Sequence, residues 1–141
     1  MKHFNLKSGD YKISIPSAIE YEKYMSIIPV VNGWWWLRTP ANYPARAAYV
    51  GKNGYLSTND GNYVRGVFGV RPILIYGKYV IDVGRGDTFT ALGNTWRVID
   101  DGRAISEDVI THRRFDEKSN DWVKSELRAW LIEWAREREE D

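Results

Sequence analysis

The spacing of apolar and polar residues predicts a chain of many short strands. Short segments that alternate in polarity, or that are continuously apolar, recur between residues 11 and 100. Pro72 places its own segment at a sheet edge or a bulge, because proline has no N–H to donate to a neighbouring strand. We expect strands at Tyr11–Ile15, Trp34–Arg38, Arg46–Gly51, Tyr55–Ser57, Asn62–Arg65, Gly69–Tyr76, Tyr79–Val83, Asp87–Ala91 and Thr95–Asp100, with short apolar strand ends at Ile105 and Val109–Ile110.

Turn residues separate these strands. The segments 52–54 (KNG) and 59–61 (NDG) contain the Asn-Gly and Asp-Gly pairs that favour tight hairpin turns. We expect two further turns, at residues 93–94 and 101–102. The first hundred residues are therefore predicted to form strands joined by short reversals of the chain.

Two helices are expected. Ser17 and Glu20 have the spacing of a capping box, which predicts a short helix from Ala18 to Met25. The polar segment RRFDEKSND precedes the second helix, which we expect Asn120 or Asp121 to cap. Its apolar face repeats at helical spacing and comprises Trp122, Leu127, Trp130, Leu131 and Trp134. The acidic tail EREED is expected to fray. Many short strands with two helices predict one α+β domain spanning residues 1–141.

Composition limits the classes of function. Hydrophobic residues at 43% and charged residues at 28% are typical of a globular domain, and seven tryptophans are many for this length. The chain has no cysteine, so disulfides, thiolate metal sites and cysteine nucleophiles are excluded. No apolar run has the length of a membrane span, and the first residues lack the apolar core of a signal peptide. We expect a cytoplasmic or virion-associated protein and leave the compartment open.

The charge is divided unevenly between the halves of the chain. The net charge is +1, which argues against broad nucleic-acid binding. Residues 1–76 carry nine Lys or Arg and four Asp or Glu, whereas residues 77–141 carry eleven and fifteen. We favour the interpretation that the two halves pack together over the alternative of a weakly basic face on the first half.

Candidate catalytic and metal-binding groups are sparse. His3 and His112 are the only histidines, and no third ligand has a convincing spacing, so we expect no metal site and no cofactor. The acidic residues near the second helix fit helix capping better than calcium binding. Glu20 and Glu22 are expected on the solvent face of the first helix, and no nucleophile elbow, phosphate loop or metalloprotease motif is present. These observations predict a protein that is not an enzyme.

The segment from Trp34 to Pro72 is the strongest candidate for a functional surface. Trp34 and Trp36 should point one way and Trp35 the other, with Trp36 in the core. We expect Arg38 and Arg71 to be buried against tryptophan and backbone carbonyls rather than to bind anions. Turn propensity accounts for the Asn and Gly residues but not for the tyrosines, which are typical of contact surfaces. The predicted contact residues are Asn42, Tyr43, Arg46, Tyr49, Lys52, Tyr55, Ser57, Asn59, Asn62, Tyr63, Arg65 and Phe68.

Two groups of motifs resemble a known family. WWWLRTP, AAYVGKNGYLS and GVFGVRPILIY resemble the C-terminal half of a bacterial and phage domain family of unknown function. TWRVID and WVKSELRAWL resemble its N-terminal half, so the resemblance covers nearly the whole chain. The order is reversed relative to the family, which predicts a circular permutation with its joint in residues 75–87, or a domain-swapped dimer.

The resemblance implies a C-type-lectin-like fold, similar to formylglycine-generating enzymes, in which a rigid scaffold presents variable surface residues. The leading hypothesis is a non-enzymatic recognition module that binds a protein or a surface glycan through the predicted contact residues. One alternative is a small phage or mobile-element protein that inhibits a host enzyme such as a defence nuclease. Another is a structural piece of a virion, which would form symmetric oligomers.

Overall fold

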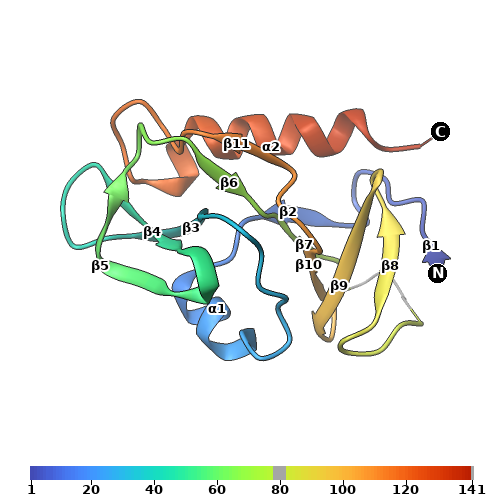
Figure 1. Ribbon diagram of the computed structural model, residues 1–141. Coiled ribbons are helices and arrows are strands. Elements are labelled where there is room, and N and C mark those ends of the chain that lie inside the picture. The colour runs from blue at the N-terminus through green and yellow to red at the C-terminus, as the bar shows by residue number, and fades with distance from the viewer. Residues whose placement is uncertain (78–81, 141) are drawn as a thin grey trace.

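The computed structural model describes residues 1–77 and 82–140 and shows two helices and two mixed β-sheets, which confirms the α+β class (Figure 1). The helices are α1 (Ala18–Tyr24) and α2 (Glu126–Glu137), and two 3-10 turns are η1 (Lys52–Gly54) and η2 (Trp122–Lys124). The strands are β1 (Lys2–His3), β2 (Lys12–Ser14), β3 (Trp35–Pro40), β4 (Arg46–Val50), β5 (Leu56–Tyr63), β6 (Phe68–Val70), β7 (Ile73–Ile75), β8 (Thr88–Ala91), β9 (Asn94–Asp100), β10 (Arg103–Ser106) and β11 (Thr111–Arg113).

The predicted strand Tyr79–Val83 falls mainly on residues 78–81, which lie outside the described residues. Neither helix of the described chain is long and apolar enough to cross a membrane.

The six-stranded sheet has the order β1-β8-β9-β10-β7-β2. Strands β8 and β9 form a hairpin around Leu92 and Gly93, whose φ angles of 50° and 68° are both in the left-handed region that a two-residue hairpin turn of this hand requires. Strands β9 and β10 form the next hairpin, around the predicted turn at residues 101–102. The N-terminal strand β1 adds in parallel to β8, a long-range pairing that local sequence patterns do not reveal.

The five-stranded sheet has the order β11-β6-β3-β4-β5. Strand β5 is one eight-residue strand, so the prediction of two strands separated by a turn at residues 59–61 is wrong. In the pairing of β4 with β5, Tyr49 lies opposite Ser57 and Ala47 lies opposite Asn62. Four residues of β5 are therefore accommodated opposite one residue of β4, and the expected turn is a bulge within the strand.

The chain passes from one sheet to the other at Arg71 and Pro72. The predicted single strand Gly69–Tyr76 is wrong, because β6 belongs to the five-stranded sheet and β7 to the six-stranded sheet. Arg71 is fully buried and donates hydrogen bonds to the carbonyl oxygens of Ser106 (2.9 Å), Pro29 (2.8 Å) and Glu107 (2.9 Å). Its guanidinium also lies over the ring of Trp35, 5.2 Å from the ring centre. The prediction that Arg71 is buried against tryptophan and backbone carbonyls is confirmed.

Two hydrophobic cores lie on opposite faces of the five-stranded sheet. Trp36 points into the larger core and Trp35 into the smaller one, as the alternation of β3 predicts, and both are buried. Helix α2 packs on the larger core and α1 on the smaller one, and Figure 1 shows the two helices on opposite sides of the sheets. The larger core also includes Phe89 and Trp96 of the six-stranded sheet, so both halves of the sequence share it. The two halves therefore pack together, and the explanation of their opposite charges stays a prediction.

Helix α1 begins as predicted, but α2 begins later. The Ser17 hydroxyl accepts the N–H of Glu20 and the Glu20 carboxylate accepts the N–H of Ser17, so the capping box is complete. Asp121 caps only η2, whereas Ser125 caps α2 by accepting the N–H of Arg128 (3.0 Å). The preceding segment is not uniformly polar, because Phe115 is fully buried in the larger core.

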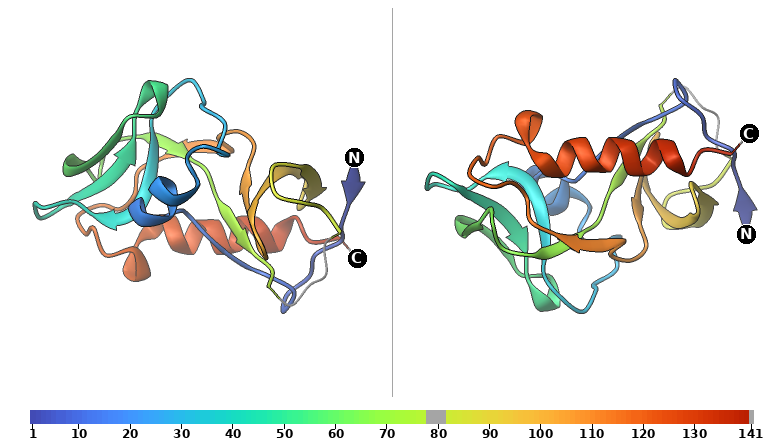
Figure 2. Two further views of the ribbon diagram at one scale, coloured as in Figure 1. Left: turned by 90° about the horizontal axis from the view of Figure 1, so that it is seen from below. Right: turned by 90° about the horizontal axis from the view of Figure 1, so that it is seen from above.

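The two ends of the described chain lie side by side in both views of Figure 2. His3 contacts the Glu140 carboxylate at 3.0 Å, and Glu139 accepts hydrogen bonds from the Ser8 N–H (2.9 Å) and the Tyr11 hydroxyl (2.7 Å). Residues 139 and 140 are thus tied to the N-terminal segment, so the predicted fraying of the EREED tail is wrong for these two residues, and Asp141 lies outside the described residues.

The circular permutation stays a prediction. It requires that residues 96–100 and residues 69–76 do not lie in unrelated sheets, and β9 and β7 lie in the six-stranded sheet with β10 between them. Strand β6, from the beginning of that segment, lies in the other sheet.

Candidate functional site

The bulge of β5 shapes the outer edge of the five-stranded sheet. The Ser57 hydroxyl accepts the N–H of Gly61 across the bulge at 3.2 Å. Gly61 has a φ of +57°, and a Cβ there would lie 2.5 Å from both the Ala47 carbonyl oxygen and the Ala41 Cβ, so only glycine fits. The residues between Ser57 and Gly61 are consequently pushed outward, and all three are exposed.

Arg46 holds two tyrosines at this edge. Its guanidinium lies 4.1 Å from the ring centre of Tyr63 and 5.8 Å from that of Tyr43, and its Nη1 donates to the Asp60 carbonyl at 3.4 Å. Each such contact contributes about 0.5–1 kcal/mol at an exposed site. The guanidinium therefore fixes the orientation of the two rings, and Tyr43 is 51% exposed and Tyr63 58% exposed.

A second aromatic group lies across three neighbouring strands. The ring of Trp34 stacks on Tyr49 with 5.4 Å between ring centres, and it meets the edge of Phe68 at 5.3 Å. Phe68 in turn stacks on the buried Trp36 at 4.5 Å. Trp34 is 45% exposed, so this cluster joins the larger core to the protein surface.

The turn between β4 and β5 carries a fourth exposed aromatic ring. Tyr55 is 67% exposed and follows η1, where Asn53 has a φ of 72°. The hydroxyl of Tyr21, from α1, donates to the Gly54 carbonyl at 2.8 Å. Helix α1 therefore positions the turn that presents Tyr55 and the exposed Lys52.

The predicted contact residues differ widely in exposure. Ser57 is buried, so its prediction as a contact residue is wrong, because its hydroxyl stabilises the bulge instead. The exposed residues of the set are Asn42, Tyr43, Lys52, Tyr55, Asn59, Tyr63 and Arg65, and the half-buried ones are Arg46, Tyr49, Asn62 and Phe68.

Several polar members of the set bond to the protein itself. The Asn42 side-chain amide donates to the side-chain oxygen of Asn59, and the Asn42 N–H donates to the Asn59 carbonyl at 3.0 Å. Arg65 Nε donates to the Glu117 carbonyl at 2.6 Å. These contacts order the surface, and they leave the tyrosine rings as its most accessible large groups.

Besides Trp34, two residues outside the predicted set contribute to this surface. Asn120 was expected to cap a helix, but its side-chain amide donates to the Arg46 carbonyl at 3.0 Å and so supports the loop before β4. Val67 is 66% exposed beside Phe68. The contact of Asn120 spans 74 residues and has no local sequence signal.

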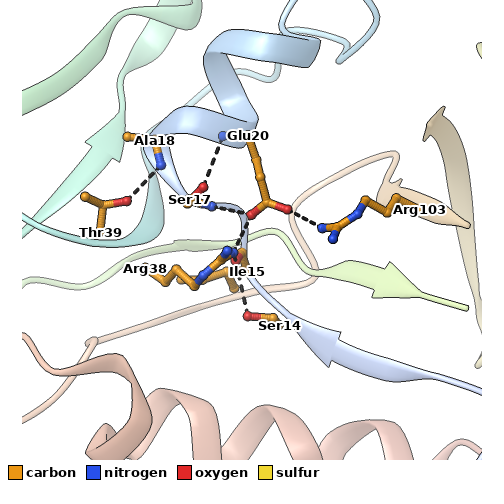
Figure 3. Close-up of polar contacts among 8 residues, drawn as sticks. All are labelled: Ser14, Ile15, Ser17, Ala18, Glu20, Arg38, Thr39 and Arg103. Atoms are coloured by element: carbon orange, nitrogen blue, oxygen red, sulfur yellow. Dashed lines mark hydrogen bonds and ion pairs between the residues drawn. The ribbon is translucent and has the colours of Figure 1, made fainter. Parts of the chain in front are cut away.

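A separate polar cluster joins α1 to both sheets (Figure 3). The Glu20 carboxylate forms ion pairs with Arg38 of β3 and, at 2.5 Å, with Arg103 of β10, and Arg38 also donates to the Ile15 carbonyl at 2.7 Å. The Glu20 side chain is only 14% exposed, so its predicted place on the solvent face is wrong. The prediction that Arg38 contacts a backbone carbonyl is confirmed, whereas the predicted packing on tryptophan is wrong because its guanidinium pairs with a carboxylate.

The two arginines of this cluster keep the Glu20 carboxyl group ionised. Burial alone would raise the pKa of the Glu20 carboxyl, but the hydrogen bond from Ser17 N–H and the charges of Arg38 and Arg103 outweigh burial and lower it. The carboxylate therefore stays ionised at neutral pH and its oxygens are occupied. The arrangement cross-links α1, β3 and β10.

Among residues 1–77 and 82–140, no three His, Asp or Glu side chains gather as metal ligands would. Compared with known proteins, the chain matches no protein family, no curated protein and no solved structure. The family resemblance inferred from the motifs stays a prediction.

Proposed function

We propose that the chain is a non-enzymatic recognition module that binds a protein or a surface glycan through the edge formed by β4, β5 and their connections. One observation carries the proposal. Among the residues that the structure describes, the aromatic side chains that are largely exposed are Trp34, Tyr43, Tyr55 and Tyr63, and all of them lie between residues 34 and 63. Exposed aromatic rings are the groups that contribute most to macromolecular interfaces.

The support of these rings strengthens the proposal. Arg46 holds Tyr43 and Tyr63, the rings of Tyr49 and Phe68 hold Trp34, and α1 holds the turn before Tyr55. Side chains that are already ordered lose less conformational entropy on binding. A rigid scaffold with accessible Tyr and Asn side chains also agrees with the function that the family resemblance implies.

The experiment is affinity capture with the immobilised protein from host lysate and from an envelope glycan fraction. We compare the wild type with a variant carrying Tyr43→Ala, Tyr55→Ala and Tyr63→Ala. Tyr49 is left intact because it packs between Trp34 and Phe68. The matched control carries Ile19→Ala and Val123→Ala, which remove exposed apolar groups of α1 and η2.

The proposal expects a component that the wild type and the control retain and the triple variant loses, with all three proteins folded by circular dichroism. Equal capture by the triple variant would contradict the proposal and place the binding surface elsewhere.

A further inference from the structure

A groove of about 520 Å³ lies between β2 and α2, on a part of the molecule separate from the β4–β5 edge. Arg128, Ile132 and Arg136 line it from the helix, and their spacing of four residues places them on one helical face. Trp122, before the helix, and Glu139, after it, also line the groove. It therefore extends along α2, whose 12 residues span about 18 Å.

The strand along this groove has an unpaired edge. Strand β2 is last in the order of the six-stranded sheet and pairs only with β7 among the described strands. The Tyr76 N–H donates to the Gly102 carbonyl, and the Pro72 carbonyl accepts the Ser106 N–H, so both groups point toward β10. The direction of the backbone groups alternates along a strand, so the N–H and C=O groups of Ile73 and Ile75 point toward β2.

The direction of the backbone groups of β2 follows from this register. Ile73 and Ile75 lie opposite Ser14 and Lys12, which therefore turn their own N–H and C=O groups toward β7. The N–H and C=O of Ile13, between them, consequently point to the other edge of β2. Lys12, Ile13 and Ser14 all line the groove, so one backbone donor and one backbone acceptor are available there.

The charge of the groove is positive. Lys12, Arg128 and Arg136 line it, against the single carboxylate of Glu139. That carboxylate already accepts hydrogen bonds from Ser8 and Tyr11. Within residues 1–77 and 82–140, neither the Lys12 ammonium nor the Arg128 guanidinium forms an ion pair, whereas Arg136 pairs with Glu133 at 3.4 Å on the exposed surface and its charge also lowers the pKa of Glu139. The floor is apolar, because Ile13, Ile75, Ile132 and Trp122 are half-buried there.

We propose that this groove binds an extended acidic peptide segment of a partner protein, which adds as a short strand beside Ile13 of β2. The alternate side chains that point toward α2 would place two carboxylates against Arg128 and Arg136 and an apolar group against Ile132 between them. About five extended residues span the length of α2, since a strand rises about 3.3 Å per residue. Main-chain pairing gives the peptide its direction, and the cations select its charge.

The test uses the whole chain and three series of heptapeptides with identical valine and leucine positions. The three remaining positions are all Glu, all Gln or all Lys. Binding is measured by fluorescence anisotropy. We expect the Glu series to bind roughly tenfold or more tightly than the Lys series, because like charges across an interface disfavour binding. In nuclear magnetic resonance spectra, the Ile13 amide should shift and become protected from exchange when the Glu peptide binds.

The charge-reversal variant carries Arg128→Glu and Arg136→Glu. It should lose at least about tenfold in affinity for the Glu peptides and prefer the Lys series. The control carries Lys118→Glu and Lys124→Glu, which change the net charge equally on exposed residues that do not line the groove, and it should bind as the wild type does.

Three results would overturn the proposal. The first is equal binding of the Glu and Lys series, and the second is failure of every Glu peptide to bind the folded protein. The third is concentration-dependent shifts of Ile13 and α2 in the free protein, which would identify a second copy of this chain as the occupant.

Discussion

At the scale of single residues, Glu20 connects parts of the chain that are far apart in the sequence. Its carboxylate accepts the N–H of Ser17, the N-cap of α1, and pairs with the guanidinium groups of Arg38 and Arg103 in the two sheets. The pKa of this carboxyl lies below the ordinary glutamate value of 4.5 in the folded protein. The contribution to stability is therefore fully present above that value and is lost as the pH falls through the folded pKa.

We predict that Glu20→Gln lowers the free energy of unfolding at pH 7 by about 1–3 kcal/mol, because two half-buried guanidinium groups lose their charged partner. The difference between wild type and variant should shrink as the pH falls below 4.5. Urea unfolding at several pH values measures both effects. Glu22→Gln, on an exposed residue of the same helix, is the control and should change stability by less than about 0.5 kcal/mol. A difference that did not depend on pH would contradict this account of the carboxyl group.

Gly61 permits a second test at this scale. We predict that Gly61→Ala destabilises the protein by about 2–4 kcal/mol, because the new Cβ meets the Ala47 backbone and the backbone is already in a left-handed conformation. Gly93 also has a positive φ but has open space around it, so Gly93→Ala should cost only about 1 kcal/mol. Thermal or urea unfolding compares the two variants. Equal losses would show that the bulge is not tightly packed at residue 61.

At the scale of elements, two residues, Asp121 and Ser125, are candidates to cap the start of α2. The structure assigns Ser125 to α2 and Asp121 to the short η2 turn. We predict that Ser125→Ala lowers the free energy of unfolding by about 1 kcal/mol and Asp121→Ala by at most about 0.5 kcal/mol. Chemical unfolding followed by circular dichroism measures both. A larger loss for Asp121→Ala would mean that the helix begins where the sequence pattern alone placed it.

Local signals predict the elements of this fold better than their connections. The capping box at Ser17 and the alternation of the tryptophans depend on neighbouring residues, and the structure confirms them. The β8–β9 hairpin forms too, but its turn lies at residues 92–93, one residue earlier than predicted. The division of the 69–76 segment at Arg71 depends instead on carbonyl groups 35 and 42 residues away. Likewise, the exposed tyrosines could be predicted as a group, whereas the clamp that Arg46 forms on Tyr43 and Tyr63 and the burial of Ser57 follow from the bulge.

At the scale of the whole molecule, the two ends of the chain stabilise each other. Glu139 accepts hydrogen bonds from the Ser8 N–H and the Tyr11 hydroxyl. We predict that Glu139→Gln increases the exchange rate of the Ser8 amide proton by roughly tenfold, because this contact holds an exposed segment that otherwise opens easily. Hydrogen exchange followed by nuclear magnetic resonance measures it. Glu137→Gln, on an exposed residue of α2, should leave that rate unchanged.

The two proposed surfaces lie on different parts of the molecule and make separate claims. The β4–β5 edge presents ordered aromatic rings, and the α2 groove presents cations above an apolar floor. Reversal of the charges on Arg128 and Arg136 should therefore leave binding at the β4–β5 edge unchanged. Truncation of the three tyrosines should in turn leave the binding of acidic peptides unchanged.

The most direct measurement for the central claim is the affinity of the captured partner for the tyrosine variants. Isothermal titration calorimetry compares the wild type, the Tyr43, Tyr55 and Tyr63 triple alanine variant, and the Ile19 and Val123 control. The account predicts at least about a hundredfold loss of affinity for the triple variant, since central interface tyrosines commonly contribute about 2 kcal/mol each, and no change for the control. An unchanged affinity in the folded triple variant would contradict recognition through the β4–β5 edge.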